Sequence, residues 1–430
     1  MSVASVLRRR AERGDPIRFG LVGAGFMGRG ILNQNRYQPG AQCAAVCNRT
    51  IDSAIDAVVA SGGTPRQVTS AADLDQAISA GEVGVTDDPA VLLGSELIAC
   101  VIEATGHVAH GAEMTSKAIE ARKNVILMNA ELDATVGPLL AKKASEAGVI
   151  YTGCDGDQPA VQLGLYDFVT NLGMTPLVCG NIKGLQDRYR TPTTQESFAR
   201  QWGQTPEMVT SFADGTKISF EQAIVGNATG MVVAERGMRG GDFSGHVDEL
   251  VDTYDVEELR RLGGVVDYVV GAAPSPGVYL LAESRDEVQA LYLKYGKLGD
   301  GPLYSFYVPY HLTVLEVVQT VVRVADFGEA VIAPKSGPVI DVITVAKRDL
   351  RAGDRLDGLG GYDAYGVCEN HPVTVAEDLL PMGLAEGCVL IRDVNKDEPI
   401  LLGDVETPRP SLVHELRREQ DRVFGSVTVT

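Results

Sequence analysis

A glycine-rich turn near the N-terminus places the strongest constraint on how this chain can fold. The run Gly23-Ala24-Gly25-Phe26-Met27-Gly28 follows an apolar stretch over residues 17–22 and precedes a segment that we expect to be helical from about Phe26. In a strand–turn–helix unit, such glycines permit a tight turn, let a diphosphate approach the backbone, and let the helix pack on the strand. The helix N-terminus then attracts the phosphates. The pattern predicts a dinucleotide-binding turn with contacts from Gly23, Gly25, Phe26, Met27 and Gly28.

The surrounding sequence favours a Rossmann domain. Short apolar runs alternate with amphipathic stretches as far as about residue 152, which is typical of βαβ units stacked around a parallel sheet. The expected strands cover residues 17–22, 42–47, 97–102, 125–128 and 149–152. We therefore predict an α/β fold whose N-terminal NAD(P)-binding Rossmann domain spans residues 1–155.

The sequence pattern of the remaining chain changes twice, and each change indicates a further domain. A helix is expected past Pro159, capped by Asp157 and ending at Gly173, and a mixed pattern with Gly-rich turns follows. This predicts an α+β domain over residues 156–335, for substrate binding and dimerisation. Residues 336–410 contain short β-like runs and a weak internal repeat, in which residues 348–356 are echoed by residues 392–400, and this predicts a small β-rich domain. Residues 411–430 read as a charged terminal helix and tail.

Composition excludes several classes of partner. A chain of 430 residues is long enough for two or three domains. Its formal net charge of −19 argues against nucleic-acid or anionic-membrane partners, which are bound mainly by clustered Lys and Arg. We find no apolar run of membrane-spanning length, no signal-peptide core and no Cys-x-x-Cys pair among the seven cysteines. We expect a cytoplasmic protein with a small-molecule substrate.

The end of the second expected strand bears on the choice of cofactor. NAD-preferring sites place Asp or Glu there, whereas this chain has Asn48-Arg49-Thr50. Arg49 can pair with a 2′-phosphate, so NADP(H) is favoured and NAD(H) remains possible; the alternative is that Arg49 only caps the loop. Thr105, Gly106 and Asn129 follow other strands at the same edge of the sheet and are further candidate cofactor contacts.

Hydride transfer also needs a proton donor and a group that stabilises the developing oxyanion. Lys183, a lone lysine after an apolar run, is the first candidate, because a lysine in a cleft of low dielectric has a lowered pKa. Glu131 and Asp157 are second candidates for a base or a ligand of the substrate hydroxyl. The alternative for Lys183 is a surface lysine, and the alternatives for Glu131 and Asp157 are roles as a loop residue and a helix cap.

Other polar residues are weaker candidates. Arg188 and Arg190 could bind a carboxylate or phosphate in bidentate fashion. The histidines at 107, 110 and 311 could titrate near neutral pH, although surface or core roles are commoner. No metal motif is evident, and Asp155, Asp157 and Asp187 could hold a cation only if folding brings them together.

These segments resemble a known family. The chain is similar to homoserine-dehydrogenase-like proteins with a C-terminal SAF domain and, more distantly, to the bacterial DXR-like 1-deoxy-D-xylulose 5-phosphate reductoisomerase. The matching segments are residues 23–28, 101–106, 128–133, 180–187, 301–313 and 346–361. The resemblance implies an NAD(P)-dependent oxidoreductase that dimerises through its middle domain and carries an SAF module where the repeat lies.

Two departures limit what the resemblance transfers. Homoserine dehydrogenases have a lysine where this chain has Ala130, and the DXR-like enzyme has a second lysine where this chain has Asn181. We therefore expect an NADP(H)-dependent oxidoreductase that acts on a small hydroxy or carbonyl compound, such as a sugar acid, sugar phosphate or semialdehyde, and that forms a homodimer or higher homo-oligomer. The alternatives are a DXR-like reductoisomerase and a non-catalytic dinucleotide-binding sensor.

Overall fold

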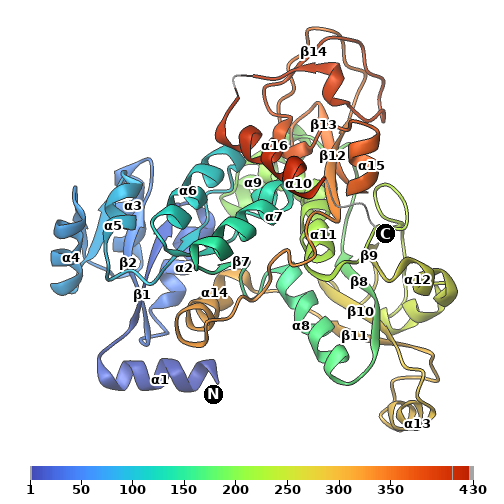
Figure 1. Ribbon diagram of the computed structural model, residues 1–430, viewed down its shortest axis with the longest axis horizontal. Helices are drawn as coiled ribbons and strands as arrows, with labels where there is room; N and C mark the ends of the chain where they lie inside the picture. The colour runs from blue at the N-terminus through green and yellow to red at the C-terminus, as the bar shows by residue number, and fades with distance from the viewer. Residues whose placement is uncertain (1, 409, 426–430) are drawn as a thin grey trace. The chain divides into compact units, whose positions relative to one another are not determined.

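The chain forms two units in the computed structural model, which describes residues 2–408 and 410–425 (Figure 1). Unit 1 contains the chain up to Asp157, the segment Leu312–Ala333 and the terminal helix that follows Ser411. Unit 2 contains Gln158–His311 and Pro334–Pro410. These units interleave along the sequence, because unit 1 takes two segments that the sequence analysis placed in the middle domain and in the tail.

Unit 1 is built on a seven-stranded parallel sheet with the strand order β3-β4-β2-β1-β5-β6-β7. Its strands are β1 (Ile17–Val22), β2 (Ala41–Cys47), β3 (Pro65–Gln67), β4 (Val83–Thr86), β5 (Cys100–Glu103), β6 (Asn124–Leu127) and β7 (Tyr151–Thr152). The predicted α/β class and the Rossmann-type sheet are confirmed. The fifth strand begins three residues later than expected, and the short strands β3 and β4 were not predicted.

The helices of unit 1 follow the strands in the expected alternation. They are α1 (Val3–Arg13), α2 (Phe26–Asn35), α3 (Ile51–Ala60), α4 (Ala71–Ser79), α5 (Pro89–Gly94), α6 (Val108–Glu120), α7 (Ala130–Ala147), α14 (Thr313–Val322) and α16 (Leu412–Phe424). A π-helical turn, Arg323–Phe327, extends α14. The predicted helix start at Phe26 is confirmed.

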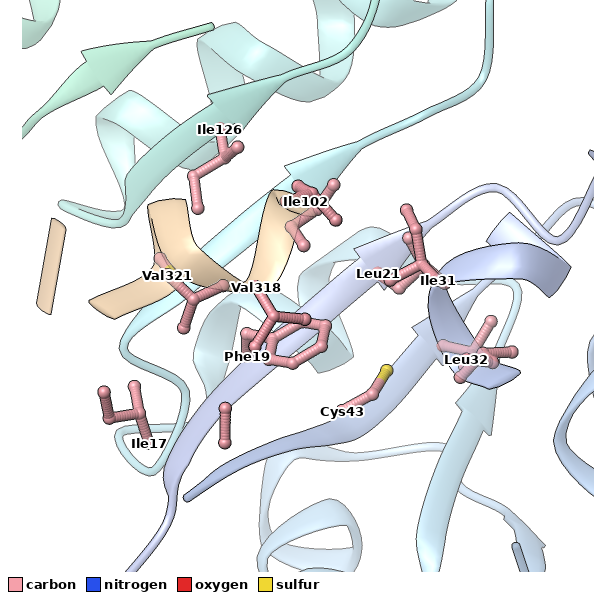
Figure 2. Close-up of a cluster of buried hydrophobic side chains, with 14 of the residues drawn as sticks. Ile17, Phe19, Leu21, Ile31, Leu32, Cys43, Ile102, Ile126, Val318 and Val321 are labelled. Carbon is pink, nitrogen blue, oxygen red and sulfur yellow. The ribbon is translucent and has the colours of Figure 1, made fainter. Parts of the chain in front are cut away.

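Helix α14 completes the core of unit 1. Val318 and Val321 point from α14 towards Phe19, Leu21 and Ile102 of the sheet, as Figure 2 shows, and all five are fully buried. Packing against α2 is close, because a Cβ added at Gly30 would lie 2.5 Å from the Val314 side chain. The apolar face of α14 therefore packs against the Rossmann sheet.

Helix α16 also belongs to unit 1, where it packs on α6 and α7 (Figure 1). Helix α7 contains Pro138 in its interior, and the buried Gln420 of α16 forms hydrogen bonds with backbone groups next to that proline. The Gln420 side chain accepts a hydrogen bond from the Leu139 N–H (3.1 Å) and donates one to the Thr135 carbonyl (3.3 Å). A proline disrupts the helical hydrogen-bond ladder, and here a neighbouring side chain inserts at the gap.

Unit 2 contains a four-stranded mixed sheet with the order β11-β10-β8-β9. Its strands are β8 (Thr175–Lys183), β9 (Val265–Val270), β10 (Gly277–Glu283) and β11 (Leu303–Val308). Strands β8 and β9 are parallel, and the other two pairs are antiparallel. The accompanying helices are α8 (Gln158–Asn171), α9 (Pro192–Trp202), α10 (Pro206–Ala213), α11 (Thr216–Thr229), α12 (Val256–Leu262) and α13 (Glu287–Tyr295). Helix α8 packs on β8 and β10, and α11 packs on α8.

The C-terminal part of unit 2, residues 336–408, contains short antiparallel pairs, and we call it the repeat module. Its elements are β12 (Ile340–Ala346), β13 (Ala364–Asn370), α15 (His371–Ala376), β14 (Val389–Leu390) and β15 (Val405–Glu406). Strand β12 pairs with β13, and β14 pairs with β15. Helix α11 packs on both β12 and β13.

The internal repeat in the sequence is a structural repeat. Leu350 and Val394 exchange backbone hydrogen bonds of 2.8 and 3.0 Å. The amide of Ala352 donates to Asp393 (2.9 Å), and the amide of Lys396 donates to Asp349 over the same distance. Each of these residues lies 44 positions from its counterpart, so the two halves of the module hold each other through symmetric contacts.

No helix within the described residues combines the length and the apolar character that crossing a membrane requires.

Candidate functional site

The glycine turn has the geometry that its sequence predicts. Gly23 has a φ of +103°, which an L side chain rarely adopts. A Cβ added at Gly28 would lie 2.1 Å from the carbonyl oxygen of Gly23, so only glycine fits where the helix crosses the turn. A Cβ at Gly25, in contrast, would meet nothing within 4 Å. The turn is therefore tight on its protein side and open at Gly25.

The start of α2 offers unpaired backbone donors to a ligand. Gly25 is the N-cap of the helix and provides no side-chain hydrogen bond, unlike the serine caps of α1 and α4. The first N–H groups of a helix have no partner within the helix, and they carry its partial positive charge. An open glycine and an uncapped helix start fit the diphosphate of a dinucleotide.

The predicted contacts at the end of β2 have different surroundings. Asn48 Oδ1 accepts a hydrogen bond from the Ala24 N–H (3.1 Å), and Asn48 Nδ2 donates to the Thr50 carbonyl (2.8 Å). Asn48 therefore braces the glycine turn. Arg49 is exposed, and Arg29, which the sequence analysis did not single out, donates to the carbonyl of Ser53 in the next helix (3.3 Å). The guanidinium groups of Arg29 and Arg49 thus belong to segments next to the carboxyl end of β2.

Thr105, Gly106 and Asn129 lie at the carboxyl ends of β5 and β6. Thr105 donates its N–H (2.9 Å) and its hydroxyl to the carboxylate of Glu103. Asn129 caps α7 by accepting from the Leu132 N–H (3.1 Å), and it donates to the carbonyl of His107 (3.2 Å). Burial raises the pKa of Glu103, and the bonds from Thr105 oppose that rise. Parallel strands end at one edge, so these groups share an edge with the glycine turn.

Asp157 lies near the carboxyl group of Asp133, which was not predicted as a site residue. Glu131 is buried in the first turn of α7, and Asp157 accepts from the Thr313 hydroxyl (3.3 Å). Asp133 is buried as well, and it accepts a hydrogen bond from the Tyr151 hydroxyl (2.9 Å). Burial raises the pKa of Asp133 to about 7, and the charge of Asp157 adds to this. The sequence showed Asp133 beside Glu131, but not its burial.

Asp155 lies in the same loop and is held by α14. It accepts from the Thr320 hydroxyl (2.9 Å) and from Arg323 Nε (3.2 Å). Asp155 and Asp157 belong to unit 1 and Asp187 belongs to unit 2. No group of three metal-ligating side chains occurs among the residues that the structure describes.

Lys183 ends β8 in unit 2. Burial lowers the pKa of Lys183 below its ordinary value, and the carboxylates of Glu221 and Asp214 oppose this shift. Glu221 lies on α11, and Asp214 immediately precedes that helix and forms a buried ion pair with Lys347 (2.9 Å). Lys183 itself makes no ion pair within the described part of the chain. A lysine in these surroundings can release and take up a proton closer to neutral pH than an exposed lysine.

A chain of amides lies next to Lys183 on β8. Asn181 is fully buried and donates to the side-chain oxygen of Gln158, whose amide nitrogen lies 2.9 Å from His311 Nε2. The side-chain oxygen of Asn181 has no hydrogen-bond partner among the described residues. Through Gln158, His311 is therefore connected to β8, the strand that carries Lys183. Gln158 was missed, because nothing in its sequence context separates it from a helix-start residue.

The two arginines after β8 differ. Arg190 Nε pairs with Asp187 (3.1 Å), whereas Arg188 makes a cation–π contact with Tyr365, its guanidinium carbon lying 5.5 Å from the ring centroid. The helix-start histidines, His107 and His110, are exposed, and burial lowers the pKa of His110.

Comparison with known proteins gives one match at the level of sequence families. Residues 156–317 match the family described as the catalytic domain of oxidoreductase DRL. This segment covers most of unit 2 and includes Lys183, Asn181 and His311. A search of curated proteins found no match. The match supports assignment to the oxidoreductases.

Solved structures that match this chain at low identity include two dehydrogenases. A probable dehydrogenase from Thermotoga maritima is 13% identical, with a TM-score of 0.41, covering 74% of this chain and 92% of that one. The UDP-N-acetylglucosamine 3-dehydrogenase GnnA from Acidithiobacillus ferrooxidans is 10% identical, with a TM-score of 0.42 and the same coverage. GenD2 from gentamicin A biosynthesis, in complex with NAD, is 13% identical, with a TM-score of 0.39, covering 75% and 90%.

Proposed function

We propose that the protein is an NADP(H)-dependent oxidoreductase that transfers a hydride to or from a small polar hydroxy or carbonyl substrate, such as a sugar acid, sugar phosphate or semialdehyde. The observation that carries this proposal is the glycine turn, where the uncapped start of α2 and the open face of Gly25 suit a diphosphate. The family match over residues 156–317 supports the same class of chemistry.

A preference for NADP(H) over NAD(H) is part of the proposal. An NAD site usually has an acidic residue at the end of the second strand to bind the ribose 2′-hydroxyl. Here Asn48 and Arg49 occupy that place, and Arg29 lies on the neighbouring helix. A guanidinium group binds a phosphate in bidentate fashion, so a 2′-phosphate would gain contacts that a hydroxyl lacks.

Lys183 is the proposed proton donor and acceptor. The bound dinucleotide supplies or accepts the hydride. In the oxidation direction the neutral amine of Lys183 takes the hydroxyl proton as the substrate carbon loses its hydride. In reduction the ammonium form returns that proton to the carbonyl oxygen. The lowered pKa of Lys183 increases the neutral fraction at a given pH.

The test combines cofactor binding with turnover. Fluorescence titration should give tighter binding of NADPH than of NADH, and Arg49→Gln should reduce that difference. A substrate screen at the absorbance of the reduced cofactor should find activity that Lys183→Ala lowers at least about a hundredfold, the lower end of the usual range for an acid–base residue. Lys142→Ala, a surface control paired with Glu146, should match the parent.

Two results would contradict the proposal. A Lys183→Ala variant as active as the parent would reject the role of Lys183. Tight NADPH binding without turnover on any substrate of these classes would favour the dinucleotide-binding sensor.

A further inference from the structure

The loop that follows β8, residues 184–190, is held in place by unit 2 itself. The Asp187 N–H donates to the Ala213 carbonyl (2.8 Å), and the Asp187 carboxylate accepts from the Tyr189 N–H (3.1 Å). At the far end of the loop, the buried ammonium group of Lys347 donates to the Arg190 carbonyl (2.8 Å). The backbone of the loop is therefore ordered before any ligand binds.

The repeat module holds the side chains of the same loop. Asp397 accepts one hydrogen bond from the Tyr189 hydroxyl (2.8 Å) and another from the Tyr365 hydroxyl (2.9 Å), each on a different carboxylate oxygen. The ammonium nitrogen of Lys396 lies 3.6 Å from the centroid of the Tyr189 ring, within the range of a cation–π contact. Asp397 thus links the loop to β13, which carries Tyr365.

Arg188 is the cation that this arrangement leaves without a carboxylate. Its guanidinium carbon lies 5.5 Å from the centroid of the Tyr365 ring, within the range of a cation–π contact, and the residue is exposed. Among the residues that the structure describes, no acidic side chain forms an ion pair with Arg188, whereas Arg190 in the same loop is paired with Asp187. A contact with one aromatic ring restricts where a guanidinium group lies and leaves N–H groups able to bind an oxyanion.

Tyr268 connects Arg188 with the strand pair that carries Lys183, the proposed proton donor. Tyr268 interacts electrostatically with Arg188 and lies in register with Asn181 across the parallel pair of β8 and β9. Lys183 follows Asn181 by two residues, so it lies on the same face of the sheet. Arg188 and Lys183 are therefore associated with one face of this strand pair.

We propose that Arg188 binds an anionic group of the substrate, a carboxylate or a phosphate, and that Asp397 of the repeat module is the positioning residue that orients Arg188 through Tyr365. The inference rests on the proposed function, because it assigns a substrate class to the site of Lys183. The net charge of −19 repels anions from the molecule as a whole, so an anion requires such a local cation.

The test is calorimetric titration of the full-length protein with inorganic phosphate and with glycolate, each with and without saturating NADP+. Phosphate bound at the glycine turn competes with the dinucleotide, and phosphate bound at Arg188 does not. Arg188→Gln should weaken the NADP+-insensitive binding at least tenfold. Arg200→Gln, which removes an equally charged and exposed arginine of α9, should leave it unchanged. Binding of phosphate alone, glycolate alone or both identifies the anion that the site accepts.

A second pair of variants tests the positioning role. Asp397→Asn should weaken the Arg188-dependent binding several-fold. Asp393→Asn removes another carboxylate of the repeat module, one that contacts Arg351 and the Ala352 N–H but not the tyrosines, and it should have no effect. Equal weakening by both variants would show a general structural effect and reject the role of Asp397.

The outcomes also separate this inference from the proposed function. If the parent binds neither anion, or if Arg188→Gln binds as well as the parent, the anion site does not exist. If NADPH does not bind while anion binding still depends on Arg188, the anion site remains and the hydride-transfer proposal fails.

Discussion

Single glycines in the turn after β1 perform separable tasks. The space at Gly25 is open, whereas Gly28 lies against the Gly23 carbonyl. Gly25→Ala should therefore change the free energy of unfolding by less than about 1 kcal/mol, since alanine is only a poorer N-cap. It should nevertheless weaken NADPH binding at least about tenfold, or about 1.4 kcal/mol, because the added methyl group occupies the diphosphate position.

Gly28→Ala is the matched comparison. Its Cβ would collide with the backbone, so both the free energy of unfolding and the affinity for NADPH should fall, the former by about 1–3 kcal/mol. Chemical denaturation and fluorescence titration of the two variants measure both quantities. Unchanged NADPH affinity in Gly25→Ala would show that the turn does not bind a diphosphate.

Asp133 should make the stability of the fold depend on pH. Burial raises its pKa to about 7 in the folded state, so the folded protein retains a proton that the unfolded chain has lost above about pH 4. The contribution of Asp133 is then fully present below that pH and is lost as the pH rises towards 7. Asp133→Asn keeps an acceptor for Tyr151 and removes the titration.

The free energy of unfolding should therefore depend more steeply on pH in the parent than in Asp133→Asn. Between pH 4.5 and 7.5, the free energy of unfolding of the parent should fall relative to that of Asp133→Asn by on the order of 2–4 kcal/mol. Urea denaturation across this range measures the difference. Parallel curves would mean that Asp133 is ionised in the folded state throughout.

At the scale of elements, the contact between α7 and α16 depends on one amide. Gln420 satisfies a backbone donor and a backbone acceptor at the break caused by Pro138. Gln420→Leu would leave the Leu139 N–H buried without a partner, while the Thr135 carbonyl would keep its hydrogen bond from Arg417 (3.4 Å). We therefore expect a loss of about 1–3 kcal/mol in the free energy of unfolding. Gln420→Glu, which can accept but not donate, should fall between this variant and the parent. Thermal denaturation measures the order, and an unchanged midpoint for Gln420→Leu would contradict it.

The same scale shows what the sequence can predict. Strand β1 was predicted to the residue and α2 was predicted to begin near Phe26, where it does begin, because an apolar run, three glycines and a helical pattern all indicate one local structure. The valines of α14 indicate a buried face, but periodicity does not say against which sheet that face packs. The roles of Asp133 and Gln158 depend on burial and on partners distant in sequence, which a local pattern does not encode.

For the whole molecule, the division into two units means that the first and last helices, α1 and α16, belong to the same unit. Unit 1 is completed by α14 and α16, which follow most of unit 2 in the sequence. A fragment ending at Asp157 would therefore expose the core surface that Val318 and Val321 cover. The glycine turn belongs to a unit that needs nearly the full length of the chain.

Helix α13 is the surface of unit 2 on which we expect a second copy of the chain to bind. None of its residues is buried, and Val288, Leu291, Tyr292 and Tyr295 expose 64–85% of their surface on one helical face. Figure 1 shows α13 at the end of the connection between β10 and β11. Its N-terminal end carries Asp286 and Glu287, and its C-terminal end carries Lys297 and Lys294, which is paired with Asp300 (2.7 Å). Two copies packed antiparallel would bury the apolar faces and set each acidic end against a basic end.

We therefore predict a homodimer that depends on α13. Leu291→Glu places a charge at the centre of the apolar face and should convert the dimer to a monomer, because burying an unpaired carboxylate costs more than the contact supplies. Light scattering after gel filtration measures the mass. Val59→Glu changes an exposed apolar residue of α3 in unit 1 (56% exposed, against 65% for Leu291) and is the control that should leave the mass unchanged. A monomeric parent, or a Leu291→Glu variant that remains dimeric, would exclude α13 as the interface.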